Sequence, residues 1–235
     1  MCGRYYRRSD KQKIAEAFHV RGDMEGLIVE SANYNIAPST FQPVIRNDKE
    51  TGEREMVLMR WGLVPHFAKS LADFKGFSTI NARAESITKN AVWRIPFQRR
   101  RCLVPADGFY EWKKLDAKTK QPYAFGMQDG KPFAFAGLWD AWKDPDGGWL
   151  QSYSIITTEA NELMAPVHNR MPVILKPTDY ARWLARDPRS TQGKGHGDLP
   201  IDLLRPFDAE NMQAAPANVL VGNVRNNGPE MLNSA

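Results

Sequence analysis

The sequence predicts an α+β protein built around a mostly antiparallel, barrel-like β-sheet with short helices at its flanks. Six short stretches rich in β-branched and aromatic residues follow one another closely, as strands of such a sheet do. Turns rich in Asp, Gly and Pro separate several of them. Helical patterns are few and flank these stretches instead of alternating with them. Close-set strands with tight turns favour antiparallel pairing over a parallel α/β sheet.

The first expected element is a short amphipathic helix over residues 9–19. Ser9 and Gln12 match a capping box, and Ile14 and Phe18 fall four residues apart on one face. Three further helical patches are expected, the last of them capped by Thr178. They cover residues 84–90, 159–164 and 178–186.

The expected strands come from runs of apolar residues bounded by turn signals such as Asp129-Gly130. Their pattern suits strands with one face buried in a core. They cover residues 44–46, 56–61, 101–104, 123–127, 133–138 and 153–157.

The chain is expected to form one domain over residues 1–235. Residues 187–200 contain three glycines and few apolar residues, which predicts a mobile loop. The elements on either side of this loop are too small to fold separately. A chain of this length buries roughly 70% of the surface that its unfolded form exposes, so its core needs no disulfide or metal.

The composition is that of an ordinary globular protein, with 42% hydrophobic and 25% charged residues. Lys and Arg (32) exceed Asp and Glu (27), and the formal net charge of +5 is compatible with a polyanionic partner without requiring one. The two cysteines, Cys2 and Cys102, are expected to be reduced thiols in a cytoplasmic protein. The polar, basic first residues indicate no targeting segment, and no apolar run suits a membrane span, so no membrane association is expected.

Metal and cofactor chemistry lacks its usual sequence signatures. Four scattered histidines and two distant cysteines form no metal-binding spacing. The chain has no Walker A loop, no dinucleotide-binding glycine motif and no nucleophile elbow. We therefore expect no metal and no cofactor, and chemistry carried by side chains or by the chain terminus.

Cys2 becomes the first residue once Met1 is removed, which is common before a small residue. An N-terminal cysteine carries an α-amine and a thiol on adjacent carbons, and the α-amine has a pKa of about 7.7–8.0, against about 10.4 for lysine. This amine can form an imine with an aldehyde, which the thiol then closes into a thiazolidine. Alternatively, the thiol can act as an acyl-transfer nucleophile with the amine as its base.

Several later stretches place polar groups among apolar residues. Asn81 and Arg83 are two residues apart and would share one face of a strand. Glu111 lies between aromatic residues, where desolvation suits it to proton transfer. His168 lies between two prolines that stiffen its backbone, and an Asn-Val-Arg run occupies residues 223–225.

Each of these stretches also has a purely structural interpretation. Arg83 could pair with Glu85, His168 could be a hydrogen-bonded core residue, and Glu111 could end a strand. Cys102 is expected to be a buried small hydrophobe.

A basic and aromatic segment over residues 89–101 suits single-stranded nucleic acid. It combines five basic residues with Trp93 and Phe97 and contains no acid, and further arginines lie beside the N-terminus. Basic groups contact phosphates while aromatic rings stack on bases. Pro38 and Phe67 could present rigid wedges to an unstacked base. The alternative is a solvated basic face with the wedge residues in core and turn positions.

Seven motifs, in this order along nearly the whole chain, resemble the SRAP family, the SOS-response-associated peptidase-like proteins that process abasic sites in DNA. They lie at residues 1–4, 34–38, 61–65, 80–85, 105–112, 168–172 and 222–225.

The resemblance implies an SRAP-like fold and a sensor of abasic sites in single-stranded DNA that acts in the DNA damage response. After Met1 removal, Cys2 would form a thiazolidine crosslink with the ring-opened aldehyde of the lesion and shield it. Crosslink formation and reversal, with peptidase or hydrolase and lyase-like activity, would follow. The protein would be a cytoplasmic monomer, found on the nucleoid when bound to DNA.

The resemblance also implies roles for individual residues. Asn81 would hold the Cys2 amine and the sugar hydroxyl, Glu111 would shuttle protons, and His168 would help to open the deoxyribose ring and assist reversal. The DNA-binding residues would be Arg4 and Arg83 on phosphates, Thr157 in the pocket wall, and Pro38 and Phe67 as wedges. Some relatives place tryptophan where this chain has His66 and Phe67.

Two other functions remain open at this stage. Class II glutamine amidotransferases also begin Met-Cys-Gly and use the mature cysteine as a nucleophile, although this chain shows neither a synthase domain nor an Asn-Gly-Glu loop. The protein could also be a non-covalent module that binds single-stranded nucleic acid. In that case Cys2 would have no role, and the segment over residues 89–101 would make the contacts.

Overall fold

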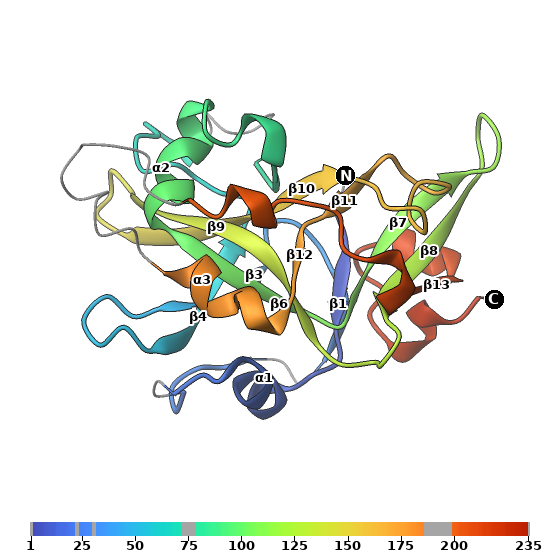
Figure 1. Cartoon of the computed structure of the whole chain (residues 1–235), viewed down its shortest axis with the longest axis horizontal. Coiled ribbons are helices and arrows are strands. Elements are labelled where there is room, and N and C mark those ends of the chain that lie inside the picture. Colours follow the sequence, from blue (N-terminus) through green and yellow to red (C-terminus); the bar gives the residue numbers. More distant parts are fainter. Residues whose placement is uncertain (1, 22–23, 30–31, 72–78, 186–198, 235) are drawn as a thin grey trace.

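The computed structural model describes residues 2–21, 24–29, 32–71, 79–185 and 199–234. Two β-sheets form most of this part of the chain, and short helices lie at its periphery (Figure 1). The structure is thus mostly β, and the expected α+β, barrel-like architecture is confirmed. Most of the predicted mobile loop at 187–200 lies outside the described residues.

Five strands close into a barrel. Strand β10 pairs with β4, and the order continues through β3 and β6 to β9, which pairs with β10 again. These pairs are antiparallel except for β10 with β4, which run parallel. Closure satisfies strand edges that would otherwise be exposed. The five strands are β3 (Phe41–Asn47), β4 (Arg54–Trp61), β6 (Arg101–Ala106), β9 (Phe133–Lys143) and β10 (Trp149–Glu159).

Three short strands extend this sheet beyond the ring. β5 runs parallel to the last part of β10, while β11 runs antiparallel to the same part on its opposite edge. β12 pairs with β9. The C-terminal end of β10 therefore lies between two strands from distant parts of the sequence. The bounds are β5 (Asn81–Arg83), β11 (Arg170–Pro172) and β12 (Ile174–Leu175).

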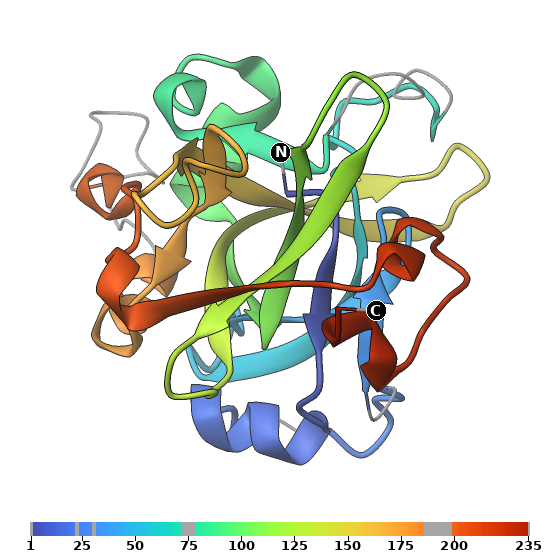
Figure 2. The same cartoon turned by 90° about the vertical axis from the view of Figure 1, so that its right-hand side faces the viewer.

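A second, antiparallel sheet has the strand order β13-β8-β7-β1-β2 and faces the viewer in Figure 2. It combines strands from both ends of the sequence, so the two termini come to the same sheet. Its strands are β1 (Tyr5–Arg7), β2 (Asn33–Ile36), β7 (Gly108–Lys114), β8 (Lys120–Met127) and β13 (Met212–Pro216).

The chain crosses from the barrel into the second sheet at Asp107 and Gly108. The Asp107 carboxylate accepts hydrogen bonds from the backbone N–H groups of Arg8 and Ser9 at 2.7 and 2.9 Å and from the Ser9 hydroxyl at 2.9 Å. A Cβ atom at Gly108 would lie 2.1 Å from the Tyr6 hydroxyl, so only glycine fits there. This crossing ties the N-terminal strand to the strand that carries Glu111.

The helices are α1 (Lys11–Phe18), α2 (Ala91–Arg99) and α3 (Tyr180–Leu184). Each buries its apolar side chains in a cluster shared with barrel residues such as Leu103 and Ala136. Phe18 of α1 stacks on Tyr180 of α3, with ring centroids 5.4 Å apart. A second cluster contains barrel residues together with Tyr5 and Phe109 of the second sheet, and Cys2 belongs to it.

The six predicted strands are confirmed, and all are longer than expected. Strands β1, β2, β5, β7, β11, β12 and β13 were not predicted. Most of these are short, and they are held by pairing with distant strands, which local sequence patterns do not report.

Several helix predictions were wrong in detail. Asp10, not Ser9, caps α1, with Asp10 Oδ1 accepting from the Lys13 N–H at 2.8 Å, because Ser9 is bound to Asp107. Residues 84–90 form a 3₁₀ turn followed by other turns, and the helix begins only at 91, despite Pro96 inside it. Residues 159–164 form turns after the end of β10, and the side chain of Thr178 does not cap α3.

Candidate functional site

Cys2 belongs to the same buried cluster as Ile155 of β10 and Phe109 of β7. Its side chain is fully buried, and Sγ lies 4.0 Å from the backbone oxygen of Arg4, its hydrogen-bond acceptor. Burial raises the pKa of the Cys2 thiol well above its ordinary value, and the nearby charge of Glu111 raises it further. The thiol is therefore protonated at neutral pH in this structure.

Glu111 reaches the N-terminus through the pairing of β1 with β7. Tyr5 lies opposite Phe109, and the Tyr110 N–H donates to the Arg4 oxygen at 3.0 Å. This register brings Glu111, which is buried, next to the first residues of the chain. Glu111 is therefore a carboxylate close to the Cys2 thiol, a position from which such a group can transfer protons.

Asn81 and Thr157 come to the same end of β10. In the parallel pairing of β5 with β10, Asn81 lies opposite Ile155 and Arg83 lies opposite Thr157. Asn81 is 6% exposed, and its Nδ2 donates to the Ile155 oxygen at 3.5 Å. Asn81 Oδ1 and Thr157 Oγ1 are buried without a hydrogen-bond partner among the described residues. Such groups cost free energy in the folded protein, and a bound ligand is one way to satisfy them.

His168 lies just before β11, on the other side of β10. Nδ1 of His168 lies 3.0 Å from the Arg170 backbone nitrogen and 3.3 Å from the Arg170 backbone oxygen. When Nδ1 accepts the shorter bond from the N–H, a neutral imidazole carries its proton on Nε2. The Arg170 guanidinium donates to both carboxylate oxygens of Glu85, at 2.5 and 3.0 Å, and to the Thr157 backbone oxygen at 2.8 Å. This pairing lowers the pKa of Glu85. The sequence allowed Glu85 to pair with Arg83, but its ion pair in the structure is with Arg170.

Arg4 and Arg83 are accessible near these groups. Arg83 is exposed at the end of β5. Arg4 is partly buried, and its Nη1 donates to Asn35 Oδ1 at 3.0 Å. Burial lowers the pKa of the Arg4 guanidinium. The neighbouring Arg7 is buried, and it donates to the Ser9 backbone oxygen at 2.7 Å.

Pro38 and Phe67, the two residues expected to act as wedges, lie on two loops that are both hydrogen-bonded to the Arg60 side chain. Phe67 is 50% exposed, and Pro38 is partly exposed. Arg60 donates to Ser39 Oγ at 2.8 Å on one loop and to the Gly62 oxygen at 2.9 Å on the other. The Leu63 N–H also bonds to the Thr79 oxygen, which brings the Phe67 loop alongside the residues that lead into Asn81.

A buried carboxylate holds the Phe67 loop on the barrel. Asp140 Oδ2 accepts a hydrogen bond from the backbone N–H of His66 and also lies 3.0 Å from Nδ1 of the His66 ring. The other carboxylate oxygen of Asp140, Oδ1, accepts a hydrogen bond from the Arg100 guanidinium. Sequence patterns did not single out Asp140 or Arg60, which are polar residues inside strands with no motif of their own, and they gave no role to Asn35 within the motif at residues 34–38. The His66–Phe67 ring contact, with centroids 5.4 Å apart, extends the support to Phe67.

The predicted basic and aromatic segment over residues 89–101 is wrong as a stacking surface. Trp93 and Phe97 are buried on the inner face of α2. Arg101 is also buried, and its Nε donates to the Trp183 oxygen at 2.6 Å. The apolar face of the helix, not base stacking, explains the aromatic residues.

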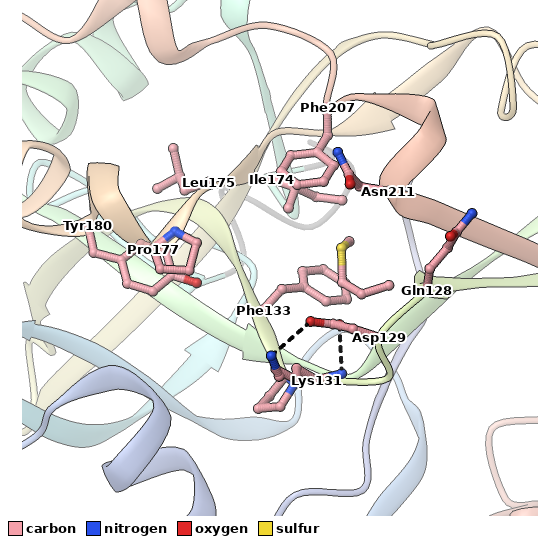
Figure 3. A pocket seen from close by; sticks show the side chains of 12 residues that line it. Gln128, Asp129, Lys131, Phe133, Ile174, Leu175, Pro177, Tyr180, Phe207 and Asn211 are labelled. Atoms are coloured by element: carbon pink, nitrogen blue, oxygen red, sulfur yellow. Dashed lines mark hydrogen bonds and ion pairs between the residues drawn. The ribbon is translucent and has the colours of Figure 1, made fainter.

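A separate pocket of about 480 Å³ lies between the β8–β9 turn, β12 and the segment that precedes β13 (Figure 3). Phe133, Tyr180 and Phe207 give it apolar walls, and the ion pair of Lys131 with Asp129, 3.3 Å long, lies at one side. No predicted site residue lines this pocket.

No group of three or more His, Cys, Asp or Glu side chains in the described part of the chain is placed to hold a metal ion. None of the helices described is long and apolar enough to cross a membrane.

The fold and this arrangement define a class of protein: a closed β-barrel with a second sheet, and a candidate reactive centre at a buried cysteine in position 2. The chain belongs to the SRAP family, since the family model described as SOS response associated peptidase (SRAP) matches residues 1–224.

Several relatives align with most or all of this chain. The abasic site processing protein YoqW of Bacillus subtilis is 40% identical over 235 residues, with both chains covered completely. The abasic site processing protein HMCES of Mus musculus is 32% identical, covering 85% of this chain and 64% of its own. A crystal structure of a protein from Bacteroides thetaiotaomicron has a TM-score of 0.84 and 26% identity, with both chains covered completely.

Proposed function

We propose that this protein detects abasic sites in single-stranded DNA and forms a covalent crosslink to them through Cys2. Two findings support this function: the chain belongs to the SRAP family, and its sequence is 40% identical to that of a protein named for abasic site processing. The observation that carries the proposal is the burial of Cys2 beside Glu111, in the same cluster as Ile155 of β10. There Asn81 and Thr157 each have an oxygen without a partner among the described residues.

The proposed chemistry requires no external oxidant or reductant. Hydrolysis of the Met1–Cys2 peptide bond consumes one water and frees the α-amine of Cys2. This amine adds to the aldehyde carbon of the ring-opened deoxyribose, and loss of one water gives an imine. The Cys2 sulfur then adds to the imine carbon while the thiol proton passes to the nitrogen, which closes a five-membered thiazolidine.

The raised pKa of the Cys2 thiol supports an order for these steps. A protonated thiol is a poor nucleophile, whereas an α-amine with a pKa of about 7.7–8.0 is partly neutral at physiological pH. The amine therefore reacts first, and the thiol adds to the more electrophilic imine. Glu111 is the base that accepts and returns the proton during these transfers.

Asn81 and His168 handle the sugar. The free Oδ1 of Asn81 accepts a hydrogen bond from the Cys2 amine or from a sugar hydroxyl. The Nε2–H of neutral His168 donates to the ring oxygen of the deoxyribose as the ring opens, and the same group assists reversal. The Thr157 hydroxyl lies between Asn81 and His168 and lines the site where the sugar binds.

The DNA strand is held on both sides of the lesion. Arg4 and Arg83 bind phosphates, since guanidinium groups match phosphate geometry. Pro38 and Phe67 fill the space left by the missing base and press on its neighbours. The protein acts as a cytoplasmic monomer and a single domain, needs no metal or organic cofactor, and joins the nucleoid through DNA.

The test mixes purified protein with a single-stranded oligonucleotide that carries one abasic site and measures a crosslink that resists denaturants, with and without borohydride. The wild-type protein is expected to give a stable adduct in both cases. Cys2→Ala is expected to give none without borohydride, because its α-amine forms only a reversible imine, which borohydride would trap. Cys102→Ala is the matched control, because Cys102 is equally buried but lies within the barrel. Release of glutamate from glutamine would point to an amidotransferase, and reversible binding alone to a non-covalent binding module.

A further inference from the structure

The guanidinium of Arg4 has an unusual environment for a charged group. It is half-buried, and its one hydrogen bond to a described residue goes to the neutral amide oxygen of Asn35. Within the described part of the chain, no carboxylate pairs with it. A desolvated arginine without an acidic partner retains its full positive charge for an anion from solution.

Asn35 is held from the other side by the C-terminal part of the chain. This residue is buried on β2, and its Nδ2 donates to the backbone oxygens of Val221 at 3.2 Å, Asn223 at 2.9 Å and Asn226 at 2.8 Å. An amide group offers two N–H donors, so three acceptors around it define its orientation closely. The oxygen of Asn35 is left to face Arg4.

The segment over residues 218–227 is itself organised to receive Asn35. Asn226 Nδ2 donates to the Leu220 oxygen at 2.8 Å, and Asn218 Oδ1 accepts from the Leu220 N–H at 3.0 Å. Asn227 Oδ1 accepts from the Tyr34 N–H at 2.7 Å, which attaches the segment to β2, an edge strand of the second sheet. Its asparagines therefore shape a turn whose carbonyls converge on Asn35.

We infer that Asn35 is a positioning residue, which the segment over residues 218–227 orients so that Arg4 is aimed at a phosphate of the bound strand while keeping its full charge. This inference rests on the proposed function, because it deepens the DNA-binding role of Arg4. It gives a purpose to two motifs, at residues 34–38 and 222–225, that the crosslinking chemistry does not use.

The amide is suited to this task in a way that a carboxylate is not. An aspartate at position 35 would pair with Arg4 and neutralise the charge that a phosphate needs. It would also face three carbonyl oxygens with no hydrogen to donate. The Asn35 amide fits both neighbours, because its Nδ2 donates to the backbone oxygens and its Oδ1 accepts from Arg4.

The test measures reversible binding of a single-stranded oligonucleotide with a stable tetrahydrofuran abasic analogue, at several salt concentrations, in the Cys2→Ala background. Loss of one phosphate contact is expected to reduce the slope of log Kd against log salt by about 0.7. We expect this reduction, with about tenfold weaker binding at low salt, for Arg4→Ala, Asn35→Ala and Asn35→Asp. The double variant Arg4→Ala/Asn35→Ala is expected to match Arg4→Ala alone.

Asn227→Ala is the matched control, because it removes another tie between the same segment and β2 without touching Arg4. It is expected to leave the salt slope unchanged. An equal loss of slope in Asn227→Ala, or a further loss when Asn35→Ala is added to Arg4→Ala, would overturn the inference. Thermal melting identifies variants that do not fold, and Asn35→Asp, which keeps the size of the side chain, carries the test if Asn35→Ala is one of them.

The two proposals can fail independently. If the wild-type protein forms no crosslink but the salt slopes change as expected, the covalent function fails and the role of Asn35 stands. If crosslinking occurs but Asn35→Ala and Asn35→Asp bind with the wild-type slope, the reverse holds.

Discussion

The backbone N–H of Arg170 donates a 3.0 Å hydrogen bond to Nδ1 of His168, two residues before it. When this bond occupies the Nδ1 lone pair, the neutral ring presents an N–H at Nε2. Arg170 is itself tied to Glu85 and to the Thr157 backbone oxygen. The tautomer and the place of the histidine thus depend on residues from two motifs, at 80–85 and 168–172, and on Thr157 of β10.

Replacing His168 by alanine is expected to slow crosslink formation by about 10²-fold, within the usual contribution of a general acid or base. Reversible binding of the same DNA is expected to change little, since the group acts on the sugar. Single-turnover crosslinking rates at saturating protein provide the measurement. His19→Asn is the control, because His19 is exposed and has the left-handed backbone conformation that asparagine also tolerates. An unchanged rate for His168→Ala would remove His168 from the mechanism.

Glu85→Gln is expected to lower stability at pH 7 by about 0.5–1 kcal/mol, because the pair with Arg170 is partly exposed. The Arg170 partner lowers the pKa of Glu85 in the folded protein below the ordinary value of 4.5. The stabilisation is therefore present above that ordinary value and is lost as the pH falls through the lowered pKa. Urea titrations of both proteins over a series of pH values from 7 downward test this, and a stability difference that does not shrink as the pH falls below 4.5 would contradict it.

The buried thiols predict slow alkylation of the folded protein. Burial raises the pKa of both Cys2 and Cys102 far above neutrality, so neither is a thiolate at pH 7.5. Mass spectrometry after iodoacetamide treatment is expected to find both unmodified in the folded protein and both modified in urea. Rapid labelling of Cys2 alone would show a reactive thiolate and would reverse the proposed order in which amine and thiol attack.

Asp140→Asn is expected to lower stability by about 3 kcal/mol, because a buried carboxylate that binds Arg100 and His66 is replaced by an amide. It is also expected to weaken binding of the abasic analogue, since the Phe67 loop loses its anchor. In a Phe67→Ala background, the same change is expected to affect stability but not binding. Additive binding losses would show that Asp140 acts elsewhere than on Phe67.

Phe97→Ala is expected to cost about 3–5 kcal/mol of stability, as for other fully buried phenylalanines. Because Phe97 belongs to the core, the salt slope of DNA binding is expected to stay at the wild-type value. Denaturant titration and the binding assay together check this. A lower salt slope with normal stability would restore the stacking role first considered for residues 89–101.

Some features of this protein follow from local sequence. The six long strands were predictable because each buries a stretch of β-branched and aromatic side chains, which is a property of consecutive residues. The same is true of the apolar face of α1, with Ile14 and Phe18 four residues apart. Asn81, Glu111 and His168 were identifiable as candidates because a chemically active side chain stands among apolar neighbours, and Cys2 because removal of Met1 would make it the first residue.

Tertiary structure alone decided how these pieces meet. The parallel pairing of β5 with β10, and the pairing of β11 on its other edge, bring Asn81 and His168 to the two sides of Thr157. The burial of Trp93 and the link from Arg4 through Asn35 to Val221 likewise depend on residues far apart in the chain. Strand pairing and hydrogen bonds between distant segments arise from the global packing of the chain, whereas periodicity reports only on near neighbours. The sequence by itself therefore determined which groups are available, and the fold decided which of them share a site.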